Sequence, residues 1–189
     1  MEQIFKISIG SQLFILKDLI RYAVVMFIGY GLLVTFYDPE LKHGLGPIIV
    51  VAYTLVVLLP CLLIHGQYLI YSHDTSISVD FGNKTMRITR HNKTASIGVD
   101  QVRRVSIIRA PQWATGETVW LASDRYRYAD IELEGGARYV VTCLIIFDLA
   151  KFFHRLEIWT TERRVIFPLV SISDYKQEGH QNPKNDWVA

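Results

Sequence analysis

Two long apolar runs near the start of the chain constrain its fold more than any other feature. Residues 22–37 read YAVVMFIGYGLLVTFY, and residues 47–71 read PIIVVAYTLVVLLPCLLIHGQYLIY. Between the two runs lie Asp38, Glu40 and Lys42, the only residues with an acidic or a Lys/Arg side chain from residue 22 to residue 71. A helix over residues 19–37 is on the order of 28 Å long, close to the thickness of a bilayer core. The sequence therefore predicts a hairpin of two transmembrane helices, residues 19–37 and 47–71.

Two other interpretations of these runs are weaker. A signal peptide has a short apolar core followed by a small-residue cleavage site, which the first run lacks. Buried helices of a soluble protein normally keep a polar stripe, which neither run shows. Within the second run, Pro47 suits a first helical turn and Pro60 predicts a kink near the middle.

Basic residues around the runs predict the orientation. Three of them precede the first run and three follow the second, whereas the connector has only Lys42: Lys6, Lys17, Arg21, Arg87, Arg90 and Lys93. Because cytoplasmic flanks of membrane helices carry an excess of Lys and Arg, both termini are expected in the cytoplasm and the connector outside.

Residues 1–18 form a separate N-terminal segment that is less apolar than either run. Ser11 is a candidate helix cap. The segment is interpreted as a helical extension of the first span, with two alternatives open. One is a partner-binding helix, and the other is an amphipathic interfacial helix that turns Phe5, Leu13, Phe14 and Leu16 toward lipid.

After residue 72 the pattern changes to short alternating segments typical of half-buried strands. Residues 75–81 and 85–90 flank a Gly82-Asn83 turn, and residues 126–133 and 138–146 flank Gly135-Gly136, so each pair predicts a hairpin. Further strands are expected at residues 95–99, 102–108 and 119–122, with a loop at 110–118 in which Trp113 is exposed.

A helix and an extension complete the predicted domain. Residues 148–158 place apolar side chains at helical spacing behind Asp148, a good cap, and so predict an amphipathic helix. In the C-terminal extension, residues 161–189, the stretch 163–170 is either a strand or an interfacial segment, with Pro168 disfavouring a strand. Residues 177–186 are polar and expected to be disordered.

The strands and turns predicted over residues 72–160 include the segments ISVDF, GNKTMRIT, IGVDQVRRVSI and ELEGGARYVVT, and the closing helix follows them. This order of elements resembles the pleckstrin-homology-like (PH-like) fold. Two spans before such a domain resemble bacterial membrane proteins that carry one. The resemblance implies a membrane helical hairpin plus an α+β, mainly β, cytoplasmic domain, an antiparallel barrel or sandwich closed by a C-terminal helix. It also implies a bacterial inner-membrane location.

The sequence offers little chemistry. It has no HExxH, GxxxxGK[ST], GxGxxG or GxSxG motif, so no metal, no cofactor and no enzymatic activity are predicted. Cys61 and Cys143 lack metal-type spacing and are expected to be buried free thiols. The net charge of +2 disfavours nucleic-acid binding. Acidic side chains on one face of a strand, with arginines opposite, are interpreted as a balanced surface: Asp130, Glu132, Glu134, Arg125, Arg127 and Arg138.

Two sets of residues are candidate sites. His65 lies late in the second span, where polar groups are costly, and an interfacial packing role is favoured over a proton relay. Basic residues early in the domain either contact anionic headgroups or form an ordinary solvated surface: Arg87, Arg90, Lys93, Arg103 and Arg104. Arg163 and Arg164 face the same two alternatives.

The architecture predicts a non-enzymatic, membrane-anchored binding or adaptor module that docks a protein partner or another copy of itself, for example by strand pairing at a sheet edge. The alternative is a small subunit or immunity-type partner of a membrane transport, secretion or toxin system, recognised through its helices near Gly29, Gly31 and Pro60. A third hypothesis is a lipid-acting enzyme with a polar cluster at the membrane boundary: His65, Gln67, His73 and Asp74.

Overall fold

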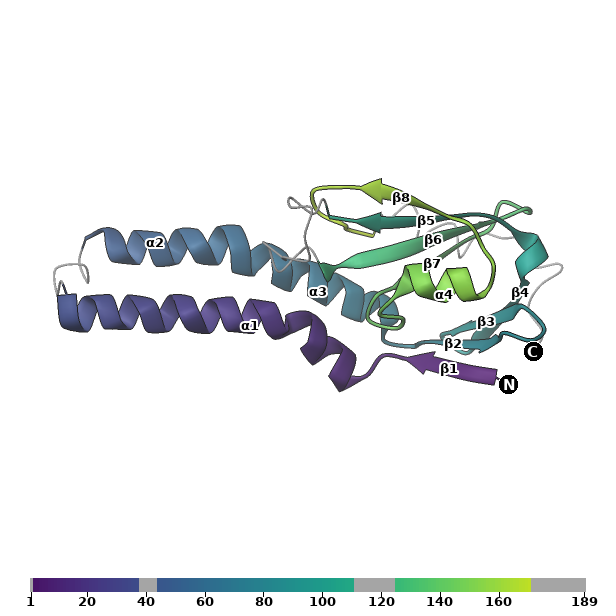
Figure 1. Ribbon diagram of the computed structural model, residues 1–189, viewed down its shortest axis with the longest axis horizontal. Helices are drawn as coiled ribbons and strands as arrows, with labels where there is room; N and C mark the ends of the chain where they lie inside the picture. The colour runs from purple at the N-terminus through teal and green to yellow at the C-terminus, as the bar shows by residue number, and fades with distance from the viewer. Residues whose placement is uncertain (1, 38–43, 111–124, 171–189) are drawn as a thin grey trace.

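The computed structural model describes residues 2–37, 44–110 and 125–170. A pair of apolar helices protrudes from one end of a domain built of two β-sheets (Figure 1). The predicted strand at residues 119–122, the exposed loop around Trp113 and the polar tail at 177–186 lie outside the described residues.

The first apolar helix is α1, Ile9–Leu32, which continues as a π-helical segment, Leu33–Tyr37. Its N-cap is Ser8, whose hydroxyl accepts a hydrogen bond from the Ser11 amide at 3.1 Å. The Ser11 hydroxyl accepts in return from the Ser8 amide at 3.2 Å. The predicted cap, Ser11, is therefore the third residue of a reciprocal capping box, and the helix begins three residues earlier than a cap at Ser11 implies.

The second apolar helix has three parts: α2, Leu45–Tyr53, a π-helical segment, Thr54–Leu58, and α3, Leu59–Ser72. Pro60 lies in the first turn of α3, directly after the π-helical segment. Because proline has no amide hydrogen to donate to the preceding turn, it favours such a local departure from α-helical hydrogen bonding. Two stretches, Leu19–Phe36 and Gly46–Ser72, are long and apolar enough to cross a membrane, and 11% of the most apolar 18 residues in each is buried.

The first sheet has the order β1-β2-β3-β4, all antiparallel. Its strands are β1, Glu2–Lys6; β2, Thr75–Asp80; β3, Thr85–Arg90; and β4, Lys93–Gly98. The predicted hairpin around Gly82 and Asn83 is confirmed as β2–β3, and the Asp80 carboxylate accepts hydrogen bonds from both backbone amides of that turn.

The N-terminal strand β1 corrects the expectation for the segment before the first helix. Residues 2–6 are not a helical extension but an edge strand that pairs with β2, placing the N-terminus beside the sheets. Phe5, an alternative lipid contact in the sequence interpretation, instead packs edge-to-face against Phe152, with ring centroids 5.5 Å apart. Because the paired residues of β1 and β2 are 70 or more positions apart, no local sequence pattern predicts this pairing.

The second sheet has the order β7-β6-β5-β8. Its strands are β5, Val102–Arg109; β6, Arg127–Leu133; β7, Arg138–Thr142; and β8, Thr160–Arg164. The predicted hairpin at Gly135-Gly136 is confirmed as β6–β7. Of the residues expected to be a strand or an interfacial segment, only 163 and 164 are in a strand, and that strand, β8, pairs parallel to β5.

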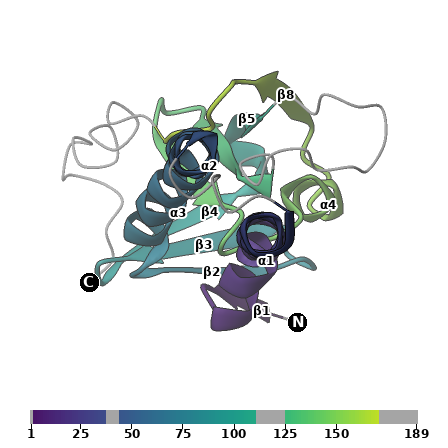
Figure 2. The ribbon, with the colours of Figure 1, turned by 90° about the vertical axis from the view of Figure 1, so that its left-hand side faces the viewer.

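One core lies between the sheets and α4, Leu149–Arg155. The predicted amphipathic helix is confirmed, with Asp148 accepting a hydrogen bond from the Lys151 amide as its cap. Leu149, Phe153 and Leu156 are fully buried against residues of both sheets. Two four-stranded sheets plus this helix are consistent with a PH-like α+β fold. Viewed along the protruding helices, α4 and β8 lie on one side and β1 lies below (Figure 2).

Candidate functional site

The apolar helices are anchored to the domain by a contact that we call the helix–sheet junction. Its centre is Tyr68 on α3, fully buried, with its ring edge-to-face against Tyr126 and Tyr128 at centroid distances of 5.4 and 6.3 Å. The other buried residues of the junction come from α1, α3, the second sheet and the segments after β7 and β8: Ile15, Ile64, Tyr71, Ile108, Val140, Cys143, Leu144 and Val170.

Hydrogen bonds fix the junction in one geometry. Gln67 uses both ends of its amide on one residue: Nε2 donates to the Val170 carbonyl at 2.8 Å and Oε1 accepts from the Val170 amide at 3.1 Å. The Tyr68 hydroxyl donates to the Pro168 carbonyl at 2.7 Å. The Ser72 and Thr142 hydroxyls are 2.6 Å apart. Buried polar groups paired in this way resist sliding or rotation of the helix on the sheets.

His65 belongs to this junction. Its ring is buried, and Nδ1 is 3.0 Å from the hydroxyl of Tyr126, whose ring meets it edge-to-face at 5.9 Å. Burial raises the pKa of Tyr126 well above its ordinary value, so this hydroxyl stays protonated at neutral pH and is able to donate to the imidazole. In this position the histidine contributes packing and one hydrogen bond between the apolar helix and the domain.

A polar pocket lies where α3 leads into β2. It has a volume of about 700 Å³ and takes residues from the end of β1, the start of β2 and the turn between β3 and β4: Lys6, Ile7, His73, Asp74, Thr75, Ser76, Thr89, His91 and Asn92. The turn residues His91 and Asn92 both have positive φ, 46° and 63°, as a two-residue hairpin turn requires.

Asp74 organises the ionisable groups of the pocket. One carboxylate oxygen is 2.7 Å from His73 Nδ1, and the other is 3.3 Å from His91 Nδ1. All three side chains are more than half exposed, so these pairs are weak in energy. Lys6 also lines the pocket, so one basic and one acidic side chain face it together with the two histidines. Across residues 2–37, 44–110 and 125–170, no group of three or more His, Cys, Asp or Glu side chains is arranged to bind a metal ion.

The structure separates the four residues of the lipid-acting enzyme hypothesis. His65 and Gln67 face the helix–sheet junction, whereas His73 and Asp74 line the polar pocket. A single polar cluster therefore does not form. Sequence reasoning missed Lys6 and His91, because both reach the pocket through strand pairing. The one local signal for His91 was the two-residue turn between alternating strands.

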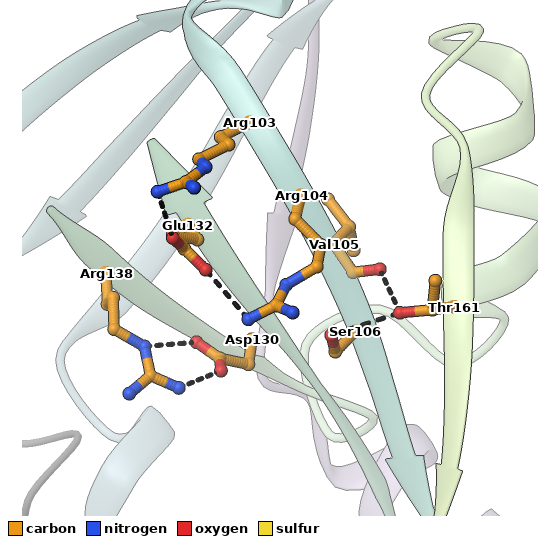
Figure 3. A network of polar contacts seen from close by, with 8 residues as sticks. All are labelled: Arg103, Arg104, Val105, Ser106, Asp130, Glu132, Arg138 and Thr161. Carbon is orange, nitrogen blue, oxygen red and sulfur yellow. Dashed lines mark hydrogen bonds and ion pairs between the residues drawn. The ribbon is translucent and has the colours of Figure 1, made fainter. Parts of the chain in front are cut away.

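The five basic candidates for headgroup contact lie on two different sheets. Arg87, Arg90 and Lys93 belong to the first sheet, where Arg87 is 3.8 Å from Glu2 and the Arg90 guanidinium stacks 4.1 Å from the centre of the Tyr71 ring. Arg103 and Arg104 belong to β5, and both bind the Glu132 carboxylate, at 3.1 and 2.9 Å (Figure 3).

Two of the three acidic residues predicted to share a strand face, Asp130 and Glu132, are balanced by arginines, whereas Glu134 lies beyond the end of β6 and Asp130 is buried rather than solvated. The guanidinium of Arg138 binds Asp130 through Nε, at 3.2 Å, and through Nη2 (Figure 3). Glu132 binds Arg103 and Arg104, which are not among the arginines expected opposite this face, Arg125, Arg127 and Arg138. The cause is strand order, because β5 lies beside β6 on the side opposite β7. Both cysteines are buried free thiols, as expected, and burial raises the pKa of Cys143 to about 11.

Among the described residues, β8 is the outer strand of the second sheet and pairs on one side only. β8 pairs with β5 on one side, and four of its five residues are exposed. Trp159, directly before it, is 93% exposed. An exposed edge strand offers unpaired backbone groups to another strand, and a fully exposed tryptophan beside it is a typical anchor for a protein partner.

Comparison with protein families identifies the fold. The sequence model of the PH domain family matches residues 4–152, which is more than half of the chain. The chain therefore belongs to the PH domain family. The match begins at Ile4 and so includes the second half of β1 and both apolar helices, which lie before the residues 72–160 on which the sequence resemblance rests. No curated protein and no solved structure matches the chain.

Proposed function

We propose that this protein is a non-enzymatic adaptor that holds a PH domain at the cytoplasmic surface of a bacterial inner membrane, where the domain docks a protein partner. The observation that carries the proposal is the helix–sheet junction. PH domains are in general binding modules without catalytic activity. In this chain, the domain is fixed by Tyr68 and Gln67 to two helices able to cross a membrane.

A fixed anchor has a functional consequence. The paired groups of the junction hold the domain in one orientation on α3, so that a partner approaching along the membrane always meets the same edge. Because β1 pairs with β2, the N-terminus lies on the same side of the helix pair as the sheets. The positive-inside tendency of the flanking basic residues supports a cytoplasmic location for that side.

The open edge of β8 supports docking of an extended peptide segment. Added strands gain main-chain hydrogen bonds along such an edge, and neighbouring side chains supply specificity. Here Trp159 provides a large apolar contact at one end of the edge. The partner is either another protein or a second copy of this chain.

Site-specific photocrosslinking in intact membranes tests the proposal. A photoreactive residue at Trp159 is expected to capture one defined protein, whereas the same residue at Gly135 is not. Gly135 is a matched control because it lies in the β6–β7 turn and a side chain there meets nothing within 4 Å. Capture that is equal at the two positions, or absent from Trp159, contradicts docking at β8.

The second candidate function is recognition through the helices, as a subunit or immunity-type partner of a membrane system. A Cβ atom added at Gly29 or Gly31 would meet nothing within 4 Å, so packing inside this chain does not require these glycines. Small residues on an open helix face allow close contact with another membrane helix. Crosslinks from Val25 but not from Trp159 would favour this function over the adaptor.

A further inference from the structure

The segment after β8 exposes three apolar side chains on a firmly held backbone. Ile166, Phe167 and Leu169 are 75%, 46% and 49% exposed. The backbone beneath them is fixed by the hydrogen bonds of Tyr68 to Pro168 and of Gln67 to Val170. We call residues 165–170 the apolar loop. Exposing several apolar side chains to water on a fixed backbone is unfavourable in free energy, so such a patch usually marks a surface that a protein or a membrane covers.

The position of the apolar loop along α3 distinguishes between a protein and a membrane. The apolar stretch Gly46–Ser72 has 27 residues, which makes it about 40 Å long. This is close to the thickness of a whole bilayer, about 40–45 Å with its headgroup layers, rather than to the roughly 30 Å of the hydrocarbon core. Gln67 and Tyr68, which bind the loop, lie four to five residues before the end of this stretch. That distance of about 6–8 Å places the loop at headgroup depth.

The shape of the domain agrees with this depth. In Figure 1 the segment that follows β8 continues from the tip of that strand toward the protruding helices and then turns back. On α3, Leu62 and Leu63 lie four to six residues before Gln67 and Tyr68, which bind the loop, and these leucines are 55% and 62% exposed.

The charge next to the loop fits a lipid surface. Arg163 and Arg164 precede it directly, and both are exposed on β8. Within the described part of the chain, neither guanidinium has an ion-pair partner, and residues 163–170 contain no acidic side chain. Apolar side chains flanked by unpaired basic ones are the pattern of segments that enter the headgroup layer of anionic membranes.

We infer that the apolar loop is a lipid-binding site: Ile166, Phe167 and Leu169 insert into the headgroup layer beside α3, and Arg163 and Arg164 bind phosphate groups of anionic lipids. The inference rests on the proposed membrane anchoring. It adds a second lipid contact, which prevents the domain from tilting away from the bilayer. The loop lies outside residues 4–152, so the family match does not supply it.

Depth-dependent fluorescence quenching tests the inference on the full chain in phosphatidylcholine/phosphatidylglycerol vesicles. An environment-sensitive dye is attached to Phe167→Cys, to Gly135→Cys in the β6–β7 turn, and to Val56→Cys in the apolar helix. The native cysteines are buried, and the unsubstituted protein measures any background labelling. The dye at Phe167 is expected to be quenched by lipids with a shallow spin label and shielded from aqueous iodide, with the opposite behaviour at Gly135.

The outcomes separate the two proposals. If the dye at Val56 is not quenched by lipids with a deep spin label, membrane anchoring itself fails. If the dye at position 56 is quenched but the dye at position 167 behaves like the dye at position 135, the proposal that the loop binds lipid is overturned. Shielding of Phe167 from iodide without quenching by any labelled lipid also overturns it, because protein then covers the loop.

The arginines are tested by charge removal. With the dye at Phe167, shallow quenching is expected to be about twofold or more stronger in vesicles with phosphatidylglycerol than in pure phosphatidylcholine. The double variant R163Q/R164Q should abolish this difference. Lys151→Gln, which removes an exposed charge on α4, should retain it. Equal loss of the difference in both variants would show a general charge effect and contradict a specific role for the two arginines.

Discussion

The two ends of the helix pair are built from similar residues but face different surroundings. Between Leu19 and Phe36, and between Gly46 and Leu59, large apolar side chains are mostly exposed. In the last part of α3, from Cys61 to Ser72, one face of the helix is buried against the sheets, and its polar side chains have defined partners. The comparison shows that hydropathy alone does not distinguish an exposed helix face from one that packs against the domain.

The physical basis of the contrast is hydrogen bonding. At the junction, Gln67, Tyr68 and Ser72 each pair with a group of the domain. In the protruding part, Thr54 donates its hydroxyl to the Val50 carbonyl of its own helix, at 2.8 Å. A helix that pairs its own polar groups is suited to lipid, whereas one that needs partners from other elements is suited to a protein interior. Substitutions at the two ends should therefore act through different mechanisms.

Tyr68→Ala should have the largest effect, because it leaves a cavity at the centre of the junction and removes the hydrogen bond to Pro168. The expected loss is about 3–5 kcal/mol in the free energy of unfolding, as for other buried aromatic residues. Chemical denaturation in detergent micelles measures it. Leu33→Ala in the protruding part, where the side chain is 51% exposed, is the matched control and should change little. Equal losses in the two variants would contradict the contrast.

Val56→Asp should impair membrane insertion, because its side chain is 70% exposed on the protruding helix. A charged residue near the centre of a span costs about 2.5–3.5 kcal/mol in translocon-based insertion scales. The fraction of protein recovered in alkali-washed membranes measures the effect. Gly135→Asp places the same charge on the domain surface and should leave recovery unchanged. Unimpaired insertion of the Val56 variant would show that this part of the helix is not in lipid.

Cys143, within the junction, should make stability depend on pH. Burial raises its pKa from 9.0 to about 11, so the unfolded state releases the thiol proton at a lower pH than the folded state. Stability is therefore intact below pH 9 and falls as the pH rises from 9 to 11, by about 2–3 kcal/mol. Urea unfolding at pH 8 and pH 10.5 measures the loss. Cys143→Ala should show a flatter dependence, and identical slopes would refute the effect.

Gln67→Leu should have the smallest effect of the four. It removes two hydrogen bonds and leaves the amide and carbonyl of Val170 unpaired, at a cost of about 1–3 kcal/mol. Hydrogen exchange at the Val170 amide should become faster, while exchange in the β6–β7 hairpin stays unchanged. Tyr68→Phe is the companion variant, because it removes only the bond to Pro168. Unchanged exchange at Val170 would mean that Gln67 does not fix the apolar loop.

Much of the fold could be predicted from local pattern. Strand alternation indicated both hairpins, around Gly82-Asn83 and Gly135-Gly136, and helical spacing behind Asp148 indicated α4. Local pattern failed for β1 and β8. The strands that pair with β1 and β8 lie far away in the sequence. Because no short hairpin turn connects either strand to its partner, the local sequence does not indicate the pairing.

The candidate sites were less predictable than the fold. His65 was recognised as unusual because a histidine is rare in an apolar run, but its partner, Tyr126, lies 61 residues further along. The polar pocket joins His73 and Asp74 to His91 and Lys6 through the register of three strands. The residue types indicate that these polar side chains need hydrogen-bond or ion-pair partners. Only the tertiary structure shows which residues those partners are.

The sequence by itself determined the two apolar helices, because residues 19–37 and 47–71 are continuous apolar runs of the length that a membrane-spanning helix needs. It also determined the mainly β character of the chain after residue 72. Only the tertiary structure decided where the helices stop being exposed and become part of the domain. That boundary depends on which side chains of the sheets come to lie against α3, and hydrophobic burial is non-directional, so apolar pattern alone does not select its partner.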